Sequence, residues 1–369
     1  MRNLFKYYLK KRISVTAIIT IICLVVSTVY LDVMDFVRRG SYWVEETNSY
    51  YETLIPSSSP LGMIAIFAAI LVIIIPVFEF YFKMRKINVD QMYSLPVKRS
   101  KLYIVKYIIG LAEIIIPITI SYIYCVVWVA CSKHMFDMIY FLPFYFALIG
   151  VIVMTYTILC FIYTRANTFF DGLILIGIYM FVLPFLFISV DHLIESDMWS
   201  YSFIYSPFFS ITRIFNALLK HNALVNTPYY EFYFNGYMIY AIVLNFVTSL
   251  IFGFLFFYLN PKDKAENAFE RSTSWFSYKV LIPVITCVAT IAFAESSDYI
   301  LPFIIAVIAY LLLAIYHRSF KVSWKELVFM AAIIICSTFI SVCIAGFDKS
   351  ISIATENDPY SYLLLLLNK

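Results

Sequence analysis

Long apolar runs separated by short polar segments dominate the pattern of this chain. Nine runs approach or reach the roughly 20 residues that a helix needs to cross a bilayer. They cover residues 13–31, 61–82, 107–130, 138–163, 169–190, 236–259, 278–294, 299–316 and 327–345. The seventh is the weakest, because it is short and Pro283, Glu295 and Asp298 crowd its ends. The pattern predicts an all-α polytopic membrane protein with about nine transmembrane helices, in which spans seven and eight form a tight hairpin.

Polar segments divide these spans into a six-span core and a three-span extension. Asn260-Pro261 ends the sixth run, since proline cannot continue a helix comfortably, and a stretch of mixed charge follows. The expected parts are an N-terminal interfacial helix (1–12), a core (13–259) with an inner loop (83–106) and an outer loop (191–235), a linker (260–279), an extension (280–346) and a short outer tail (347–369). Within the outer loop, the interrupted apolar stretch 203–219 predicts a re-entrant or interfacial helix, the alternative being a small packed helix.

Composition supports a membrane protein and excludes several other classes. The chain is 63% hydrophobic and 14% charged, against about 25% charged residues in ordinary soluble domains. The net charge of +4 follows the ends of the spans, so we expect no nucleic acid partner. Seven cysteines without a Cys-x-x-Cys pair support neither a disulfide framework nor a zinc site, and four histidines without a His-Glu-x-x-His motif give no other metal site.

The distribution of basic residues predicts the orientation of the spans. Most of the 27 lysines and arginines fall on one side if the N-terminus is cytoplasmic. We therefore expect a multi-pass protein of the cell membrane with its N-terminus inside and, with nine spans, its C-terminus outside. Residues 2–11 alternate basic and aromatic side chains, which suits a helix lying against anionic lipid headgroups, or else a plain basic flank of the first span.

The loop between the second and third runs is the most basic segment of the chain. Seven of its residues are Lys or Arg: Lys83, Arg85, Lys86, Lys98, Arg99, Lys101 and Lys106. Its Ser94-Leu95-Pro96 turn and amphipathic flanks predict a short helix under the membrane that is presented to a partner.

Three ionisable residues lie within the apolar runs, where a charge is costly and calls for a functional hypothesis. We expect Glu79 to pair with Lys83, four residues further on. Glu113 pairs with Lys106 or with another helix, or lines a pathway. Asp171 caps a helix at the inner interface, or is a second polar group of the pathway.

The sequence contains no motif for chemistry of its own. No Gly-x-x-x-x-Gly-Lys-Ser/Thr loop for phosphate and no Gly-x-Ser-x-Gly nucleophile elbow is present. We expect no catalytic residues and no cofactor bound by this chain, so any use of ATP and Mg²⁺ requires a separate ATPase subunit.

Two segments resemble the permeases of ABC-2-type ABC transporters. Residues 93–103, YSLPVKRSKLY, are similar to the "SLPVKR-x-K" stretch after the second span of that family. Residues 261–269, PKDKAENAF, are similar to the charged "R-x-S-E-K-A-G" stretch after the sixth span, although Asn267 replaces glycine and the leading arginine is missing. The likeness covers about residues 1–270.

The resemblance implies a half-transporter that exports a hydrophobic or amphipathic compound or peptide. Two permease chains, identical or related, would assemble with two ATPase subunits. The basic loop would be the coupling helix, with Tyr93 and Leu95 as apolar anchors beside Pro96, and with Lys98, Arg99 and Lys101 at the rim of the contact.

Two other functions are consistent with the sequence. A membrane-embedded enzyme or assembly factor for lipid-linked substrates would use an outer cluster such as Asp191, His192 and Glu195. A secondary transporter would need inverted repeats and ion-coupling groups at mid-membrane, for which Glu113 is the one residue available.

Overall fold

The structure of this protein is a computed structural model. It describes residues 2–33, 37–44, 49–56, 59–131, 141–194, 206, 211, 236–264, 266, 269–270, 272, 274, 276–293 and 300–357. The chain forms two compact units, and each is described by itself. The first comprises residues 1–180 and 203–272, and the second comprises residues 181–202 and 273–369.

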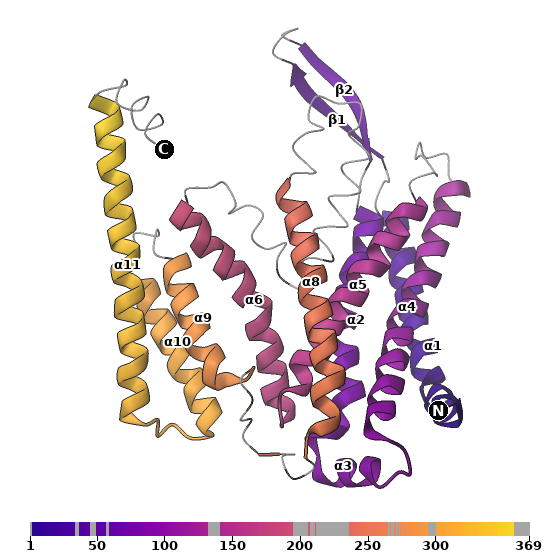
Figure 1. The fold of residues 1–369 in the computed structure, drawn as a ribbon. Coiled ribbons are helices and arrows are strands. Elements are labelled where there is room, and N and C mark those ends of the chain that lie inside the picture. Colours follow the sequence, from indigo (N-terminus) through magenta and orange to yellow (C-terminus); the bar gives the residue numbers. More distant parts are fainter. Residues whose placement is uncertain are drawn as a thin grey trace. The chain divides into compact units, whose positions relative to one another are not determined.

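Long helices build the first unit (Figure 1). They are α1 (Arg2–Val33), α2 (Ser59–Phe80), α4 (Arg99–Cys131), α5 (Phe141–Thr164), the first half of α6 (Phe169–Ile194) and α8 (Gly236–Leu259). Helix α4 packs against α1 and α2, while α5 packs against α2 and α8. Because one helix runs continuously from Arg2 to Val33, the expected interfacial segment 1–12 is joined directly to the first span.

Short elements close one end of this unit. They are the 3₁₀ turn η1 (Tyr81–Met84), helix α3 (Lys86–Tyr93) and the 3₁₀ turn η5 (Asn260–Lys262). Figure 1 shows α3 at the end of the unit where α2 and α8 finish and α4 begins, with the N-terminus nearby. We call this the α3 end.

A two-stranded antiparallel hairpin lies between α1 and α2, in the segment between the first two apolar runs. Strand β1 (Val37–Val44) pairs with β2 (Ser49–Pro56), and the register places Val37 opposite Pro56 and Val44 opposite Ser49. The hairpin is the one departure from helix among the regular elements of the described chain. Its strands are rich in the aromatic and β-branched residues that favour extended backbone.

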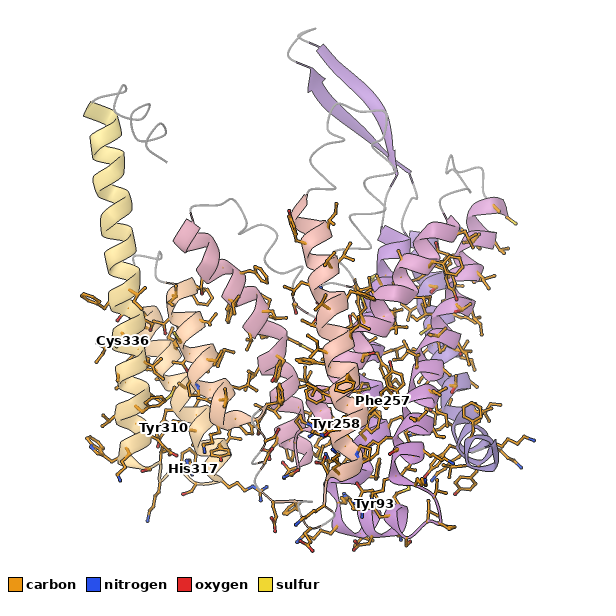
Figure 2. All side chains as sticks on the ribbon, in the orientation of Figure 1. Tyr93, Phe257, Tyr258, Tyr310, His317 and Cys336 are labelled. Atoms are coloured by element: carbon orange, nitrogen blue, oxygen red, sulfur yellow. The ribbon has the colours of Figure 1, made fainter. Side chains whose placement is uncertain are left out.

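Aromatic side chains fill the core of the first unit near the α3 end (Figure 2). The Phe80 ring stacks on Tyr103 at 6.1 Å between centroids and meets Phe256 edge-on at 5.3 Å. These three residues come from α2, α4 and α8 and are fully buried or nearly so. The cluster therefore packs three helices together near the α3 end.

The second unit contains the last three helices and the second half of α6. Helices α9 (Tyr278–Ala292), α10 (Ile300–His317) and α11 (Trp324–Asn357) pack against one another. The second half of α6 contacts α9 through the Ser189 hydroxyl, which donates to the Val288 carbonyl at 2.8 Å.

The membrane character that the apolar runs predict is confirmed, but the count of nine is not. Among the described residues, the helices long and apolar enough to cross a membrane number six: Leu4–Val29, Met63–Met84, Arg99–Trp128, Tyr145–Thr164, Phe169–Ser189 and Ile242–Lys262. Two further apolar helices, Tyr278–Ala292 and Pro302–His317, are shorter. Nine spans remain a prediction.

Two further expectations fall mostly outside the described residues. Of the proposed re-entrant stretch 203–219, the structure describes residues 206 and 211. Of the expected outer tail 347–369, residues 347–357 continue α11 and the rest lies outside the described part.

Candidate functional site

The basic loop forms a short helix followed by a tight turn. Helix α3 ends where the Ser94 N–H donates to the Asp90 carbonyl at 2.9 Å, and the Val97 N–H then donates to the Leu95 carbonyl at 2.7 Å. Pro96 fits this turn because its fixed φ suits a bend. The exposed side chains of the turn include Leu95, Pro96, Lys98, Arg99 and Lys101.

Two of the predicted docking residues brace the loop internally. The Tyr93 hydroxyl lies 3.1 Å from the Tyr103 hydroxyl of α4. The Arg99 guanidinium lies over the Tyr93 ring, 4.1 Å from its centroid, and donates to the Asp263 carbonyl at 3.1 Å. Burial raises the pKa of the Tyr93 phenol, so the group keeps its proton for this hydrogen bond. Tyr93, which Figure 2 labels beside α3, is therefore largely engaged within the chain.

The exposed apolar surface of the loop includes a residue that the sequence analysis did not single out. Ile87 on α3 is 73% exposed, whereas Leu95 is 37% exposed. The available signal in the sequence was a large aliphatic residue among the polar and charged residues of the Lys86–Tyr93 segment. Ile87 and Leu95 are thus large apolar side chains that this loop exposes.

Next to the loop, one carboxylate forms ion pairs with two cations. The Asp263 carboxylate lies 2.5 Å from the Lys83 ammonium and 3.0 Å from the Arg165 guanidinium. Both cations also donate to the Asn260 side-chain oxygen, and Lys83 donates to the Thr164 carbonyl. We call Lys83, Arg165, Asn260 and Asp263 the Asp263 network.

The position of this network follows from the helix ends around it. Helices α2, α5 and α8 all finish at the α3 end. The last carbonyl groups of a helix lack intrahelical donors and carry partial negative charge, so cations are favourable there. Lys83 follows the end of α2 and meets the last carbonyl of α5, while Arg165 directly follows α5.

Arg165 is held on both its backbone and side-chain groups. Its carbonyl accepts a hydrogen bond from the Ser272 hydroxyl at 2.8 Å. Burial lowers the pKa of its guanidinium, and the nearby Asp263 carboxylate acts in the opposite direction. Because arginine starts from a very high pKa, the group stays charged and the ion pair persists.

A second set of charges lies inside the helices. The Arg12 guanidinium of α1 is 2.6 Å from the Glu79 carboxylate of α2 and 3.5 Å from Glu113 of α4, and the Lys106 ammonium of α4 is 3.2 Å from Glu79. We call these four residues the intramembrane charge cluster. The cluster brings two acidic and two basic residues of three helices together, although neither Glu113 carboxyl oxygen has a hydrogen-bond partner among the described residues.

The expected local pair between Glu79 and Lys83 is wrong. Helix α2 ends at Phe80, and the chain tightens into η1 before Lys83. The four-residue helical spacing is therefore lost, and the two side chains face different neighbours. For Glu113, the expectation of pairing with another helix is met by Arg12 of α1.

The start of α1 also contacts α3. The Tyr8 hydroxyl donates to the Met92 sulfur at 2.9 Å. The Lys106 ammonium lies between the rings of Tyr8 and Phe82, 5.0 and 4.9 Å from their centroids. The N-terminal helix is thus joined to the loop by side-chain contacts as well as by the intramembrane charge cluster.

Asp171 lies in the first turn of α6, at the α3 end. Its backbone N–H donates to the Thr168 hydroxyl at 3.2 Å, so Thr168 is the N-cap and Asp171 is the acidic residue three positions later. A carboxylate in a first turn is favourable beside the positive end of the helix dipole. The start of the helix accounts for the position of Asp171, and a role of this residue in a pathway stays a prediction.

In the described part of the chain, no group of three or more His, Cys, Asp or Glu side chains is placed to hold a metal ion. The outer cluster of Asp191, His192 and Glu195 lies outside the side chains that the structure describes.

Comparison with protein-family models, with characterised proteins and with solved structures found no match to this chain. The likeness to ABC-2-type permeases therefore stays an expectation from the sequence, based on residues 93–103 and 261–269.

Proposed function

We propose that this chain is the membrane-spanning permease subunit of an ABC transporter, driven by a separate ATPase that docks on α3 and its turn. The main observation in support is an exposed apolar and basic surface that a network of ion pairs holds in place. The surface presents Ile87, Leu95, Lys98 and Lys101, and the Asp263 network ties the loop behind it to the ends of α2, α5 and α8.

The bracing is what a coupling element requires. A flexible loop would absorb a push from a partner, whereas a loop fixed to three helix ends transmits it. Lys83 follows α2, Arg165 follows α5 and Asp263 follows η5 after α8, so their shared contacts join these three helices at one point. Arg99, at the start of α4, adds a fourth helix through the Asp263 carbonyl.

The surface chemistry indicates the kind of groove that receives it. Interfaces combine a buried apolar centre with a polar rim. Ile87 and Leu95 supply the apolar contacts, while Lys98 and Lys101 favour a rim with acidic residues and speed the encounter. The ATPase would hold ATP and Mg²⁺, since this chain carries no phosphate-binding loop of its own.

The remaining parts of the proposal follow from the resemblance and from the basic residues. The chain resides in the cell membrane with its N-terminus and α3 in the cytoplasm, where the ATPase is found. It assembles with a second permease chain, and it exports a hydrophobic or amphipathic compound or peptide.

Co-purification of the tagged full chain in mild detergent tests the proposal. We expect an ATPase with phosphate-binding loops to accompany the wild type and to be lost from the Lys98→Glu/Lys101→Glu and Ile87→Asp/Leu95→Asp variants. Lys279→Glu is the matched control, because Lys279 is an exposed lysine remote in sequence from the loop. Retention of the ATPase by both double variants would overturn the docking surface.

A chain that comes without an ATPase, in detergent and in nanodiscs alike, would overturn the permease proposal. Activity that then depends on an ion gradient and on Glu113 would indicate a secondary transporter. Activity on a lipid-linked substrate without ATP would indicate an embedded enzyme.

A further inference from the structure

Glu113 has fewer close contacts than Glu79 in the intramembrane charge cluster. Its side chain is 2% exposed, and neither of its carboxyl oxygens accepts a hydrogen bond from a described residue. The Arg12 Nε lies 3.5 Å from Glu113 Oε1, which is longer than the usual N–H···O distance of about 2.7–3.2 Å. A buried carboxylate ion without donors is unfavourable, because it has lost its water and gained no hydrogen bonds in return.

Both cations of the cluster lie closely against Glu79 instead. The Arg12 guanidinium is 2.6 Å from the Glu79 carboxylate. The Lys106 ammonium donates to the same carboxylate at 3.2 Å and to the Glu79 backbone carbonyl at 3.0 Å. Nearby cations and hydrogen bonds favour the ionised form of a carboxyl group. Of the two acids, Glu79 is therefore the one whose negative charge the cluster stabilises.

The helices around α4 bring no further charge to Glu113. The charged groups that act on it are Glu79 of α2, Arg12 of α1 and Lys106, two turns earlier on α4. Glu79 is the one charged residue in the sequence of α2, and the sequences of α5 and α8 contain no Asp, Glu, Lys, Arg or His. The titratable Tyr156 of α5 donates to the Tyr107 carbonyl at 3.3 Å. The charge state of Glu113 thus depends on a competition with Glu79 for two cations.

We propose that Glu113 is a proton-binding site within the membrane. A proton from water adds to one of its carboxylate oxygens, and no other bond changes. The cluster then holds one ionised carboxylate, that of Glu79, beside two cations. Two carboxyl groups that share a site commonly hold one proton between them, because their like charges repel. The Arg12 side chain is 22% exposed, whereas both acids are buried, so a proton reaches the site past Arg12.

The bound proton determines how the N-terminal helix is held. With the proton in place, the Arg12 guanidinium of α1 pairs with Glu79 of α2 alone. Without it, the ionised Glu113 of α4 competes for the same guanidinium. Because the start of α1 also contacts α3 through Tyr8, the site makes the contacts of this end of the helix dependent on pH. The proposal is independent of the proposed transport function, since it concerns a proton held by this chain alone.

Infrared spectroscopy of the purified full chain in nanodiscs at pH 7 tests this site. Exposed carboxyl groups are ionised at that pH, so the C=O band of a protonated carboxylic acid reports a buried acid. We expect this band in the wild type, with a shift in D₂O, and a decrease by the intensity of one carboxyl group in Glu113→Gln. Asp90→Asn replaces an exposed acid of α3 and should leave the band unchanged. A wild type without the band, or an unchanged band in Glu113→Gln, would overturn the proposal.

Thermal unfolding and one further variant separate proton binding from a purely structural role. Glutamine copies the shape and the neutral charge of the protonated acid, so Glu113→Gln should unfold within about 2 °C of the wild type. A larger fall would show that the fold needs the ionised form, and it would overturn the proposal. Glu79→Gln leaves both cations to Glu113, which should then lose its proton and its band. A band that persists in folded Glu79→Gln would overturn the competition for the two cations.

Discussion

At the scale of single residues, Asp263 has the clearest structural role. It meets Lys83 and Arg165, which are both buried, while it is itself 24% exposed. Removing one partner of a buried ion pair is costly chiefly because the other charge remains without compensation. The Asp263 carboxylate pairs with two cations, so its removal leaves both of these charges without compensation.

We predict that Asp263→Asn lowers the free energy of unfolding by about 2–3 kcal/mol, somewhat less than for a fully buried pair because water reaches Asp263. Thermal unfolding of the purified protein in detergent measures the change. Asp90→Asn is the matched control, since Asp90 is an exposed acid on α3 and should change stability by less than about 0.5 kcal/mol. Equal effects of the two variants would show that the Asp263 network does not stabilise the α3 end.

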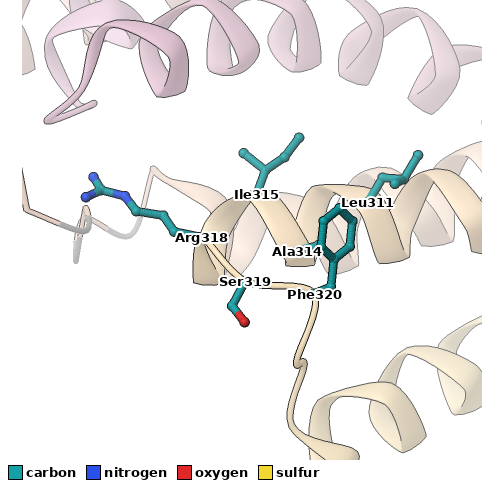
Figure 3. Close-up of a pocket in the computed structure, with 6 residues that line it drawn as sticks. All are labelled: Leu311, Ala314, Ile315, Arg318, Ser319 and Phe320. Carbon is teal, nitrogen blue, oxygen red and sulfur yellow. The ribbon is translucent and has the colours of Figure 1, made fainter.

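A second prediction concerns Arg318, the residue with a left-handed φ of 52° at the end of α10, which Figure 3 labels. Glycine adopts the φ of Arg318 without the clash of a Cβ atom, so Arg318→Gly should stabilise the protein by about 1 kcal/mol. Thermal unfolding of the purified protein in detergent checks this result. A loss of stability would mean that the Arg318 side chain contributes more to the fold than its backbone strain costs.

At the scale of elements, α4 depends on a small residue where it crosses its neighbours. A Cβ atom on Gly110 would lie 2.2 Å from the Tyr156 hydroxyl and 3.2 Å from Glu79 and Ile75. Helices in membranes approach closely through small residues of this kind. Gly110 therefore allows α2 and α5 to meet α4 beside the intramembrane charge cluster.

We predict that Gly110→Ala destabilises the protein by about 1–3 kcal/mol, because the added methyl group displaces the buried Tyr156 ring. Gly150→Ala on α5 is the matched control. No neighbouring atom lies within 4 Å of its Cβ position, and alanine favours a helix by up to about 1 kcal/mol over glycine. Thermal unfolding should thus move in opposite directions for the two variants, and movement in the same direction would contradict the packing argument.

Helix α3 shows which structural features a sequence pattern predicts and which it does not. The turn residues Ser94 and Pro96 and the charges around them predicted a short helix, and the structure has one over Lys86–Tyr93. The pattern did not distinguish the faces of the loop. Tyr93 turns toward Tyr103, whereas Ile87 is exposed. An eight-residue helix has too few turns for its apolar spacing to define a buried face, so contacts from other helices decide it.

At the scale of the whole molecule, the sides of the membrane on which the two termini lie show whether the number of spans is odd or even. We predict a cytoplasmic N-terminus and, with nine spans, an external C-terminus. Reporter fusions at each terminus, one active only in the cytoplasm and one only outside, measure this directly. A fusion within 260–279 is the control and should lie on the side of the N-terminus, since six helices precede it.

A C-terminus on the inner side would contradict the count of nine and would mean that one of α9, α10 and α11 does not cross. Helix α9 is the first to consider, because its 15 residues measure about 23 Å against a hydrocarbon core of about 30 Å.

The sequence by itself determined the membrane class, the first six helices and the short helix of the basic loop. Apolar run length is a local property, and an isolated span must satisfy its own backbone hydrogen bonds, so these elements need no knowledge of their neighbours. Only the tertiary structure decided the partners of the charges. Lys83 is four residues from Glu79 in the chain, but α2 ends between these two residues. Lys83 therefore pairs with Asp263 instead. Arg12, Glu79, Lys106 and Glu113 meet because three helices bring them together. Ion pairing depends on distance in space, which the order of residues does not contain.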